Sequence, residues 1–128
     1  MLKAKEIMSK SVSTIRPDQT LLDAMEILVC KEVSGLPVVN ADEALVGIIT
    51  EKDILNFVFS GNLKSTRVKD VMTKDVVSFS PNDNVDTIAL AIGQQRFRSV
   101  PIVERGKVVG IVSRRDIIHS ALQIHCKI

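Results

Sequence analysis

The chain has 128 residues, of which 45% are hydrophobic and 25% are charged, a composition typical of a globular domain and not of a disordered segment. A net charge of only +2, scattered arginines and the absence of Trp and Tyr argue against a nucleic-acid binder. No apolar run reaches the roughly 18 residues of a membrane span, and Cys30 and Cys126 form no disulfide framework, so we expect a cytoplasmic protein without a membrane segment.

The first half of the chain predicts six elements in order. Residues 4–8 form a helical turn, and residues 11–15 form an apolar-rich extended piece that ends at Pro17. Apolar residues at helical spacing then predict a helix; they are Leu21, Met25, Leu28 and Val29. The last elements are strands at 36–39 and 45–49, whose continuous apolar runs predict burial on both faces, and a closing helix from Glu51.

The second half repeats the first. Residues 46–55 read VGIITEKDIL, and residues 109–118 read VGIVSRRDII. The other elements recur in the same order: a helical turn at 68–72, an extended piece at 75–79, Pro81, a helix bearing Val85, Ile88, Ala89 and Ile92, strands at 100–103 and 108–112, and a helix from Arg114. Arg105-Gly106 is predicted as the tight turn of the second strand pair, because glycine readily adopts a positive φ.

Each copy therefore has the order β-α-β-β-α, and the two copies comprise residues 1–64 and 65–128. A domain of about sixty residues buries too little surface to be comfortably stable alone. We therefore predict an α/β fold in which the two copies pack as one pseudo-twofold module. Such a module would have two equivalent clefts where its halves meet.

The repeated motif Thr50-x-x-Asp53, which returns as Ser113-x-x-Asp116, allows two interpretations. In the first, the hydroxyl and the acid form a capping box at a helix start, although Asp is one methylene shorter than the usual Glu. In the second, the helix start binds a ligand, because its free N–H groups suit a phosphate and its carboxylate can accept from both hydroxyls of a ribose. The two interpretations are compatible.

The ordered set of motifs resembles a tandem pair of CBS domains, the Bateman module. Each copy shows Ile/Val-Met, a strand, Pro, a helix, Leu/Val-Pro-Val/Ile-Val and Val-Gly-Ile-Ile/Val-Thr/Ser-x-x-Asp-Ile, together covering about residues 2–122. The resemblance implies a regulatory module, often a homodimer, that needs no cofactor. Its implied ligand is an adenine nucleotide (AMP, ADP or ATP) or S-adenosylmethionine. Since the two copies fill the sequence, we expect the regulated protein to be another chain.

The resemblance also implies roles for individual residues. Asp53 and Asp116 would hold the ribose hydroxyls, with Thr50 and Ser113 beside the sugar or phosphate. The residues implied to line the adenine are Val12, Ser13, Val76 and Val77, and those implied near the phosphate are Ser34, Lys52, Arg98 and Arg115. If phosphate contacts cross the module, the cleft of Asp53 receives both arginines. We then expect that cleft to bind a phosphorylated ligand more tightly, because arginine presents a planar fork to phosphate oxygens.

Other functions have less support in the sequence. The only histidines, His119 and His125, lack a Cys or an acid at metal-ligand spacing, so we predict neither a catalytic nor a metal site. A structural dimerisation or scaffold module with degenerate clefts is the main alternative. A DNA-binding regulator is a third, but the chain has no helix-turn-helix beyond its two copies.

Overall fold

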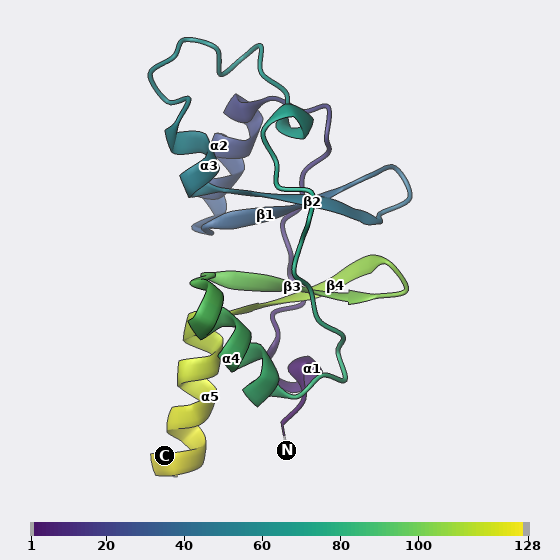
Figure 1. Ribbon diagram of the computed structural model, residues 1–128, viewed down its shortest axis with the longest axis vertical. Coiled ribbons are helices and arrows are strands. Elements are labelled where there is room, and N and C mark those ends of the chain that lie inside the picture. The colour runs from purple at the N-terminus through teal and green to yellow at the C-terminus, as the bar shows by residue number, and fades with distance from the viewer. Residues whose placement is uncertain (1, 127–128) are drawn as a thin grey trace. The chain divides into compact units, whose positions relative to one another are not determined.

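The computed structural model describes residues 2–126, which form two compact units (Figure 1). The central unit consists of residues 13–76. The terminal unit combines the stretch up to Val12 with the stretch from Val77 onward. The chain therefore mixes helices with two small antiparallel sheets, one sheet in each unit.

The central unit is built around the antiparallel pair of β1 and β2. Its elements are α2 (Leu21–Lys31), β1 (Gly35–Val39), β2 (Leu45–Thr50), α3 (Glu51–Leu55) and the 3₁₀ turn η1 (Val68–Asp70). Single bridges widen this pair on both sides. Ile15 lies parallel to Val38 beside β1, and Thr73 lies antiparallel to Ile48 beside β2.

The terminal unit repeats this plan with different chain segments. Its elements are α1 (Ala4–Ile7), α4 (Val85–Gln95), β3 (Ser99–Glu104), β4 (Lys107–Ser113) and α5 (Arg114–Cys126). Phe79 forms a parallel bridge to Ile102 beside β3, and Ser9 forms an antiparallel bridge to Ile111 beside β4. The strands predicted from the sequence are thus confirmed to within a residue or two, as are the starts of both closing helices.

Each unit has its own core. In α2, the residues Leu21, Ala24 and Leu28 recur every three or four positions and are buried, which places one helix face against the sheet. Ile88 and Ile92 do the same in α4. The sequence interpretation was wrong for Val29, which is 76% exposed. Val29 follows Leu28 directly and therefore points to another side of the helix.

The leading segment of each sequence copy packs with the other copy. The first turn of α2 donates from Leu21 N to the carbonyl of Thr66, at 3.0 Å. Likewise the first turn of α4 donates from Val85 N to the carbonyl of Leu2, at 2.9 Å, and Ala4 N donates to the carbonyl of Asp83. These bonds satisfy helix N–H groups that have no partner inside their own helix. The compact units therefore cross the boundaries of the sequence copies.

The glycine of each Val-Gly-Ile motif makes room for a methionine. Gly47 in β2 and Gly110 in β4 are both buried. A Cβ atom added at Gly47 would overlap the sulfur of Met72, and one added at Gly110 would overlap the sulfur of Met8. Both methionines pack against the core of their unit. The repeated glycine thus lets the exchanged leading segment lie directly on the strand.

The extended pieces predicted at 11–15 and 75–79 are not strands. Each contributes one bridge, at Ile15 and at Phe79, to the neighbouring strand. The neighbouring residues in those strands, Pro37 and Pro101, lack the N–H that the next link of each ladder requires. The turn at Arg105-Gly106 is confirmed, and both of its residues have a positive φ, of 55° and 80°.

Candidate functional site

The end of β2 and the start of α3 fix the geometry of Thr50 and Asp53. The backbone N–H of Thr50 donates to Oδ2 of Asp53 at 2.9 Å, and the Thr50 hydroxyl donates to the same oxygen at 3.0 Å. In return, the backbone N–H of Asp53 donates to the Thr50 hydroxyl at 3.4 Å. Both side chains are half-buried, so the carboxylate is held in one orientation at the surface of the unit.

The terminal unit builds the same arrangement from Ser113 and Asp116. The backbone N–H and the hydroxyl of Ser113 donate to Oδ2 of Asp116, at 2.8 and 2.9 Å. The backbone N–H of Asp116 donates to the Ser113 hydroxyl at 3.2 Å. The capping interpretation of both motifs is thus confirmed, and the shorter Asp side chain reaches back to the cap residue in each case.

The two carboxylates share a further property. Within residues 2–126, every protein hydrogen bond to Asp53 or Asp116 ends on Oδ2, and none ends on Oδ1. The described chain also has no buried side-chain polar atom that lacks a partner. Oδ1 of each carboxylate is therefore accessible from outside the protein, and it can accept hydrogen bonds from a ligand.

A third capping box, which the sequence reasoning missed, provides an internal comparison. Thr20 N donates to Oδ2 of Asp23 at 3.0 Å, and Asp23 N donates to the Thr20 hydroxyl at 3.1 Å. The signal was present as Thr20-x-x-Asp23. In contrast to the other two boxes, the Thr20 hydroxyl does not donate to the carboxylate among the described hydrogen bonds. The additional hydroxyl bond distinguishes the repeated motif from an ordinary cap.

The residues implied near the phosphate lie beside the same helix starts. The carbonyl of Ser34 accepts from Glu51 N at 2.9 Å, and the carbonyl of Arg98 accepts from Arg114 N at 2.9 Å. Ser34 is therefore near Thr50 in the central unit, and Arg98 is near Ser113 in the terminal unit. The side chains of Arg98, Lys52 and Arg115 are exposed. The assignment of Arg98 and Arg115 to the ligand of Asp53 stays a prediction.

The residues implied to line the adenine lie where the chain passes between the units. Ser13 and Val76 belong to the central unit, whereas Val12 and Val77 belong to the terminal unit. All four are half-buried. Ser13 precedes Ile15 by two positions, and Ile15 runs parallel to β1. Ser13 therefore lies toward the end of the central sheet where β1 begins. Val77 has the same relation to Phe79 and β3.

The strand pairing adds a neighbour that the sequence reasoning missed. Gly35 is the register partner of Thr50, and Ser99 is the register partner of Ser113. A Cβ atom at Gly35 would lie 3.3 Å from Cγ2 of Thr50. The central unit therefore fills this space with a threonine methyl, and the terminal unit has a serine side chain there. Aligning the two copies could have revealed this exchange.

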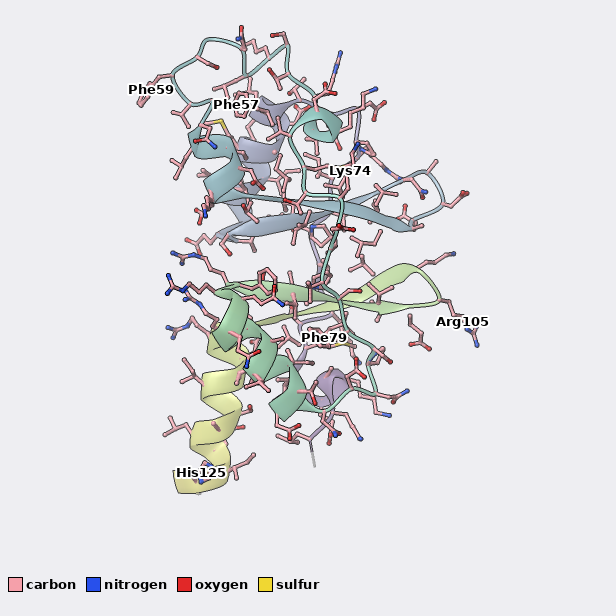
Figure 2. The ribbon with its side chains drawn as sticks, viewed as in Figure 1. Phe57, Phe59, Lys74, Phe79, Arg105 and His125 are labelled. Carbon is pink, nitrogen blue, oxygen red and sulfur yellow. The ribbon has the colours of Figure 1, made fainter. Side chains whose placement is uncertain are left out.

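The described residues were also compared with the requirements of a metal site and of a membrane span. No group of three or more His, Cys, Asp or Glu side chains in residues 2–126 could hold a metal ion. His119 and His125 are exposed on α5, and Figure 2 labels His125 near the end of that helix. No helix among these residues is both long and apolar enough to span a bilayer. The side chain of Cys126 lies outside the described part of the chain.

Comparison with known proteins agrees with the repeated architecture. The family model described as CBS domain matches residues 4–60 and again residues 68–122. The chain belongs to the CBS domain family. Two matches in tandem make it a CBS pair, and the recognition made from the sequence motifs is confirmed.

Two curated relatives show how the CBS pair occurs elsewhere. The CBS domain-containing protein YhcV of Bacillus subtilis is 32% identical over 118 residues, which cover 91% of this chain and 84% of YhcV. The inosine-5'-monophosphate dehydrogenase of Methanocaldococcus jannaschii is 37% identical over 117 residues, which cover 91% of this chain and 23% of the enzyme. This CBS pair therefore matches only a minor part of the dehydrogenase.

Two solved structures share the fold and contain ligands. The structure of CBSX2 in complex with AMP has a TM-score of 0.88 and 29% identity, and it covers 98% of this chain and 99% of that one. CBSX2 is a CBS-pair protein of Arabidopsis thaliana. The CBS pair of protein MJ0100, in complex with 5-methylthioadenosine and S-adenosylmethionine, has a TM-score of 0.84 and 30% identity, with coverage of 94% and 96%.

Proposed function

We propose that this CBS pair is a regulatory module that binds an adenosyl ligand at Asp53 and at Asp116 and transmits that binding to a separate protein. The observation that carries the proposal is that only one of the two carboxylate oxygens in each motif has a hydrogen-bond partner in the protein. Oδ2 is held by a backbone N–H and a hydroxyl, while Oδ1 is accessible and has no protein partner in the described chain. A carboxylate fixed in this way is ready to accept from the hydroxyls of a ribose.

The ligands of the two structural neighbours support the chemical class. AMP, 5-methylthioadenosine and S-adenosylmethionine, which are bound by CBSX2 or MJ0100, share an adenosine and differ in the group at its 5′ carbon. An adenosine site with variable surroundings accounts for this range. In this chain the invariant part is the carboxylate with its hydroxyl, and the variable part is the sequence beside it, Glu51-Lys52 in one copy and Arg114-Arg115 in the other.

Replacement of the two carboxylates tests the proposal. Asp53→Ala and Asp116→Ala should each weaken AMP at one site by about 1.5–3 kcal/mol, the range for hydrogen bonds to a charged group, as measured by isothermal titration calorimetry. Asp23→Ala is the matched control, because it removes the same kind of cap, with a stability cost of about 1 kcal/mol, from a box without a proposed ligand. Unchanged AMP affinity in both site variants would leave capping as the whole role of these acids.

Exposed apolar helix surface supports a second proposal, that the module forms a homodimer. Leu21 and Ile88, which mark the helices predicted from the sequence, are buried in their own units, so these side chains are not available for assembly. The available helix surface consists of other residues. These are Val29 and Leu55 in the central unit and Leu90, Ile118, Leu122 and Ile124 in the terminal unit. Ile118 and Leu122 are one helical turn apart on α5, and a contiguous exposed apolar patch is a typical feature of a protein–protein contact surface.

Light scattering tests the assembly. The unaltered chain should have twice the monomer mass, and Ile118→Asp with Leu122→Asp should halve it, because both residues lie on the same exposed side of α5. Phe59→Asp is the control. Phe59 is 98% exposed (Figure 2) on the loop after α3, so its replacement should leave the mass unchanged if helix faces make the contact. A monomeric unaltered chain at high concentration would contradict the proposal.

A further inference from the structure

The helix α4 contains an exposed glycine, Gly93, that the packing of its own unit does not explain. Each of the other five glycines either lies against a neighbouring side chain or adopts a positive φ. Gly93 does neither, and a Cβ atom added to it would meet no atom within 4 Å. Glycine is also the least favourable residue inside a helix after proline. The space over Gly93, here called the notch, is therefore open toward the outside of the protein.

The notch belongs to an exposed stripe along α4. Asp86, Leu90 and Gly93 are three or four positions apart, so they lie on one side of the helix. All three are exposed, and the side chain of Leu90 is 62% exposed. Arg96 follows at the C-cap and is exposed as well. Within residues 2–126, neither Asp86 nor Arg96 forms an ion pair. The stripe therefore presents an acid, a large apolar side chain, the notch and a base, in this order.

This order is complementary to itself when it is read in the opposite direction. Two α4 helices can cross antiparallel about a twofold axis that passes between Leu90 and Gly93. Leu90 of each copy then lies over the notch of the other copy. The same arrangement brings Asp86 of each copy toward Arg96 of the partner subunit. A twofold interface requires a surface of this kind, on which two different residues contact each other twice.

We propose that α4 packs antiparallel against α4 of a second copy of this chain, with Leu90 in the partner's notch and Asp86 beside the partner's Arg96. This inference rests on the homodimer proposed above and assigns its contact. The missing side chain at Gly93 lets the second helix approach closely, and Leu90 loses apolar surface to water. In the terminal unit, α5 packs beside α4 (Figure 1), so a contribution of Ile118 and Leu122 to the same dimer is compatible with this contact.

The equivalent helix of the central unit lacks this complementarity. Its residues at the four positions of the stripe are Leu22, Glu26, Val29 and Glu32. Val29 fills the place of the notch, and the two glutamates leave this side of α2 without a base. Pairing of α2 with α4 in the same geometry would bring Glu32 toward Asp86, which has the same charge. The contact is therefore assigned to two copies of α4, and not to α2.

Exchange of the large side chain and the notch tests the packing. Gly93→Leu fills the notch, and Leu90→Gly removes the side chain that enters it. Each single variant should raise the Kd of the dimer about 10-fold or more, as overpacking or a lost apolar contact does. In Leu90→Gly/Gly93→Leu the two features exchange places in both copies, so the Kd should return to within about threefold of the unaltered chain. Sedimentation equilibrium measures the Kd.

A charge exchange tests the antiparallel orientation. Asp86→Arg and Arg96→Asp should each raise the Kd about 2- to 10-fold, because an exposed ion pair is weak but occurs twice in the dimer. The double variant Asp86→Arg/Arg96→Asp should recover most of the affinity, and the loss in each single variant should shrink as salt rises. Additive losses in the double variant would overturn the antiparallel arrangement.

Two controls separate assembly from the stability of the unit. Gln95→Leu adds the same side chain as Gly93→Leu at an exposed position on another side of α4, so the Kd should not change. Thermal unfolding of Gly93→Leu, at a concentration where the chain is monomeric, should show no loss of stability, since leucine favours a helix over glycine. A lowered melting temperature with an unchanged Kd would show that the notch serves the fold of the unit, and would overturn the inference.

The outcomes distinguish this inference from the homodimer on which it rests. A monomeric unaltered chain at high concentration would overturn both. A dimeric chain whose Kd is the same in Gly93→Leu and in Leu90→Gly would overturn the contact through α4 and leave the homodimer standing. Loss of the dimer in both single variants, with recovery in Leu90→Gly/Gly93→Leu, is the result that the α4 contact predicts.

Discussion

The central and terminal units follow one plan up to the cap of the last helix and then diverge. The sheet, the capping box and the glycine that accommodates a methionine are the same in both. After the cap, α3 ends at Leu55, whereas α5 continues for 13 residues to Cys126. The chain after α3 turns back to Leu63 and Thr66, whose carbonyls accept from the first turn of α2. The two units therefore share the sheet, the helix start and the glycine that surround the carboxylate.

The units also differ in the connection between the two strands of each hairpin. The hairpin of the central unit has a longer connection, in which the Asn40 side chain accepts from Asp42 N and Ala44 N, whereas the terminal unit turns in two residues. The short length of α3 weakens one sequence argument, because a helix dipole builds up over several turns. The carboxylate and its hydroxyl, rather than the dipole, are therefore the common basis of the two proposed sites.

The largest expected effect concerns the exchanged leading segments. Removal of residues 2–9 should destabilise the terminal unit by about 3 kcal/mol or more, because it deletes the buried Ala4 and the packed Met8. It also removes the partner of the Val85 N–H. Hydrogen exchange should accelerate in residues 77–126 and change little in residues 13–76. Alanine at the exposed Lys5 and Lys10 is the control, and faster exchange confined to residues 13–76 would contradict the assignment.

A smaller effect is expected at the glycine that both units share. Gly47→Ala should destabilise the central unit by about 1–3 kcal/mol, the usual cost of overpacking, because the new methyl group overlaps Met72. Met72→Ala in the same chain should recover part of this loss. Gly93→Ala serves as control, since its added Cβ meets no atom within 4 Å and alanine favours a helix by about 1 kcal/mol. Thermal unfolding of these variants would measure the changes.

The smallest effect concerns the strand pair beside the capping box. Gly35→Ser should cost about 0.5–1 kcal/mol, because the new Cβ lies 3.3 Å from the Thr50 methyl and that methyl must move. Thr50→Ser in the same chain should cancel the cost, since the pair then matches Ser99 and Ser113 of the terminal unit. A double-mutant cycle in urea gives the coupling. If the free-energy costs of Gly35→Ser and Thr50→Ser are additive, the side chains at these two positions do not compete for the same space.

The repeat predicted most of the fold because its signals are local. Helical spacing, strand runs and the Ser/Thr-x-x-Asp caps depend on neighbouring residues, and these predictions are confirmed. The packing partner of each helical turn depends on contacts between residues as distant as Leu2 and Val85, which sequence periodicity does not encode. The extended pieces failed as strands because the proline that breaks each ladder lies in a different strand.

At the candidate site, the sequence identified the capping geometry and missed its neighbours. The hydroxyl bond that separates Thr50 from Thr20 depends on side-chain rotation, and both motifs have the same letters. The pairing of Gly35 with Thr50, and of Ser99 with Ser113, is known only from the strand register. The roles of Val12, Ser13, Val76 and Val77 stay predictions from the resemblance.

The exchange of leading segments has a consequence for the order of folding on the ribosome. The central unit is one continuous stretch, so all of its contacts become available once residue 76 has been synthesised and has left the exit tunnel. The terminal unit needs both ends of the chain, which gives it a high contact order and slower folding. During synthesis, residues 2–12 must wait for a partner segment that emerges only after residue 76. Nascent chains therefore expose Ala4 and Met8 until the stretch from Val77 onward has been synthesised, a period in which a chaperone can bind them.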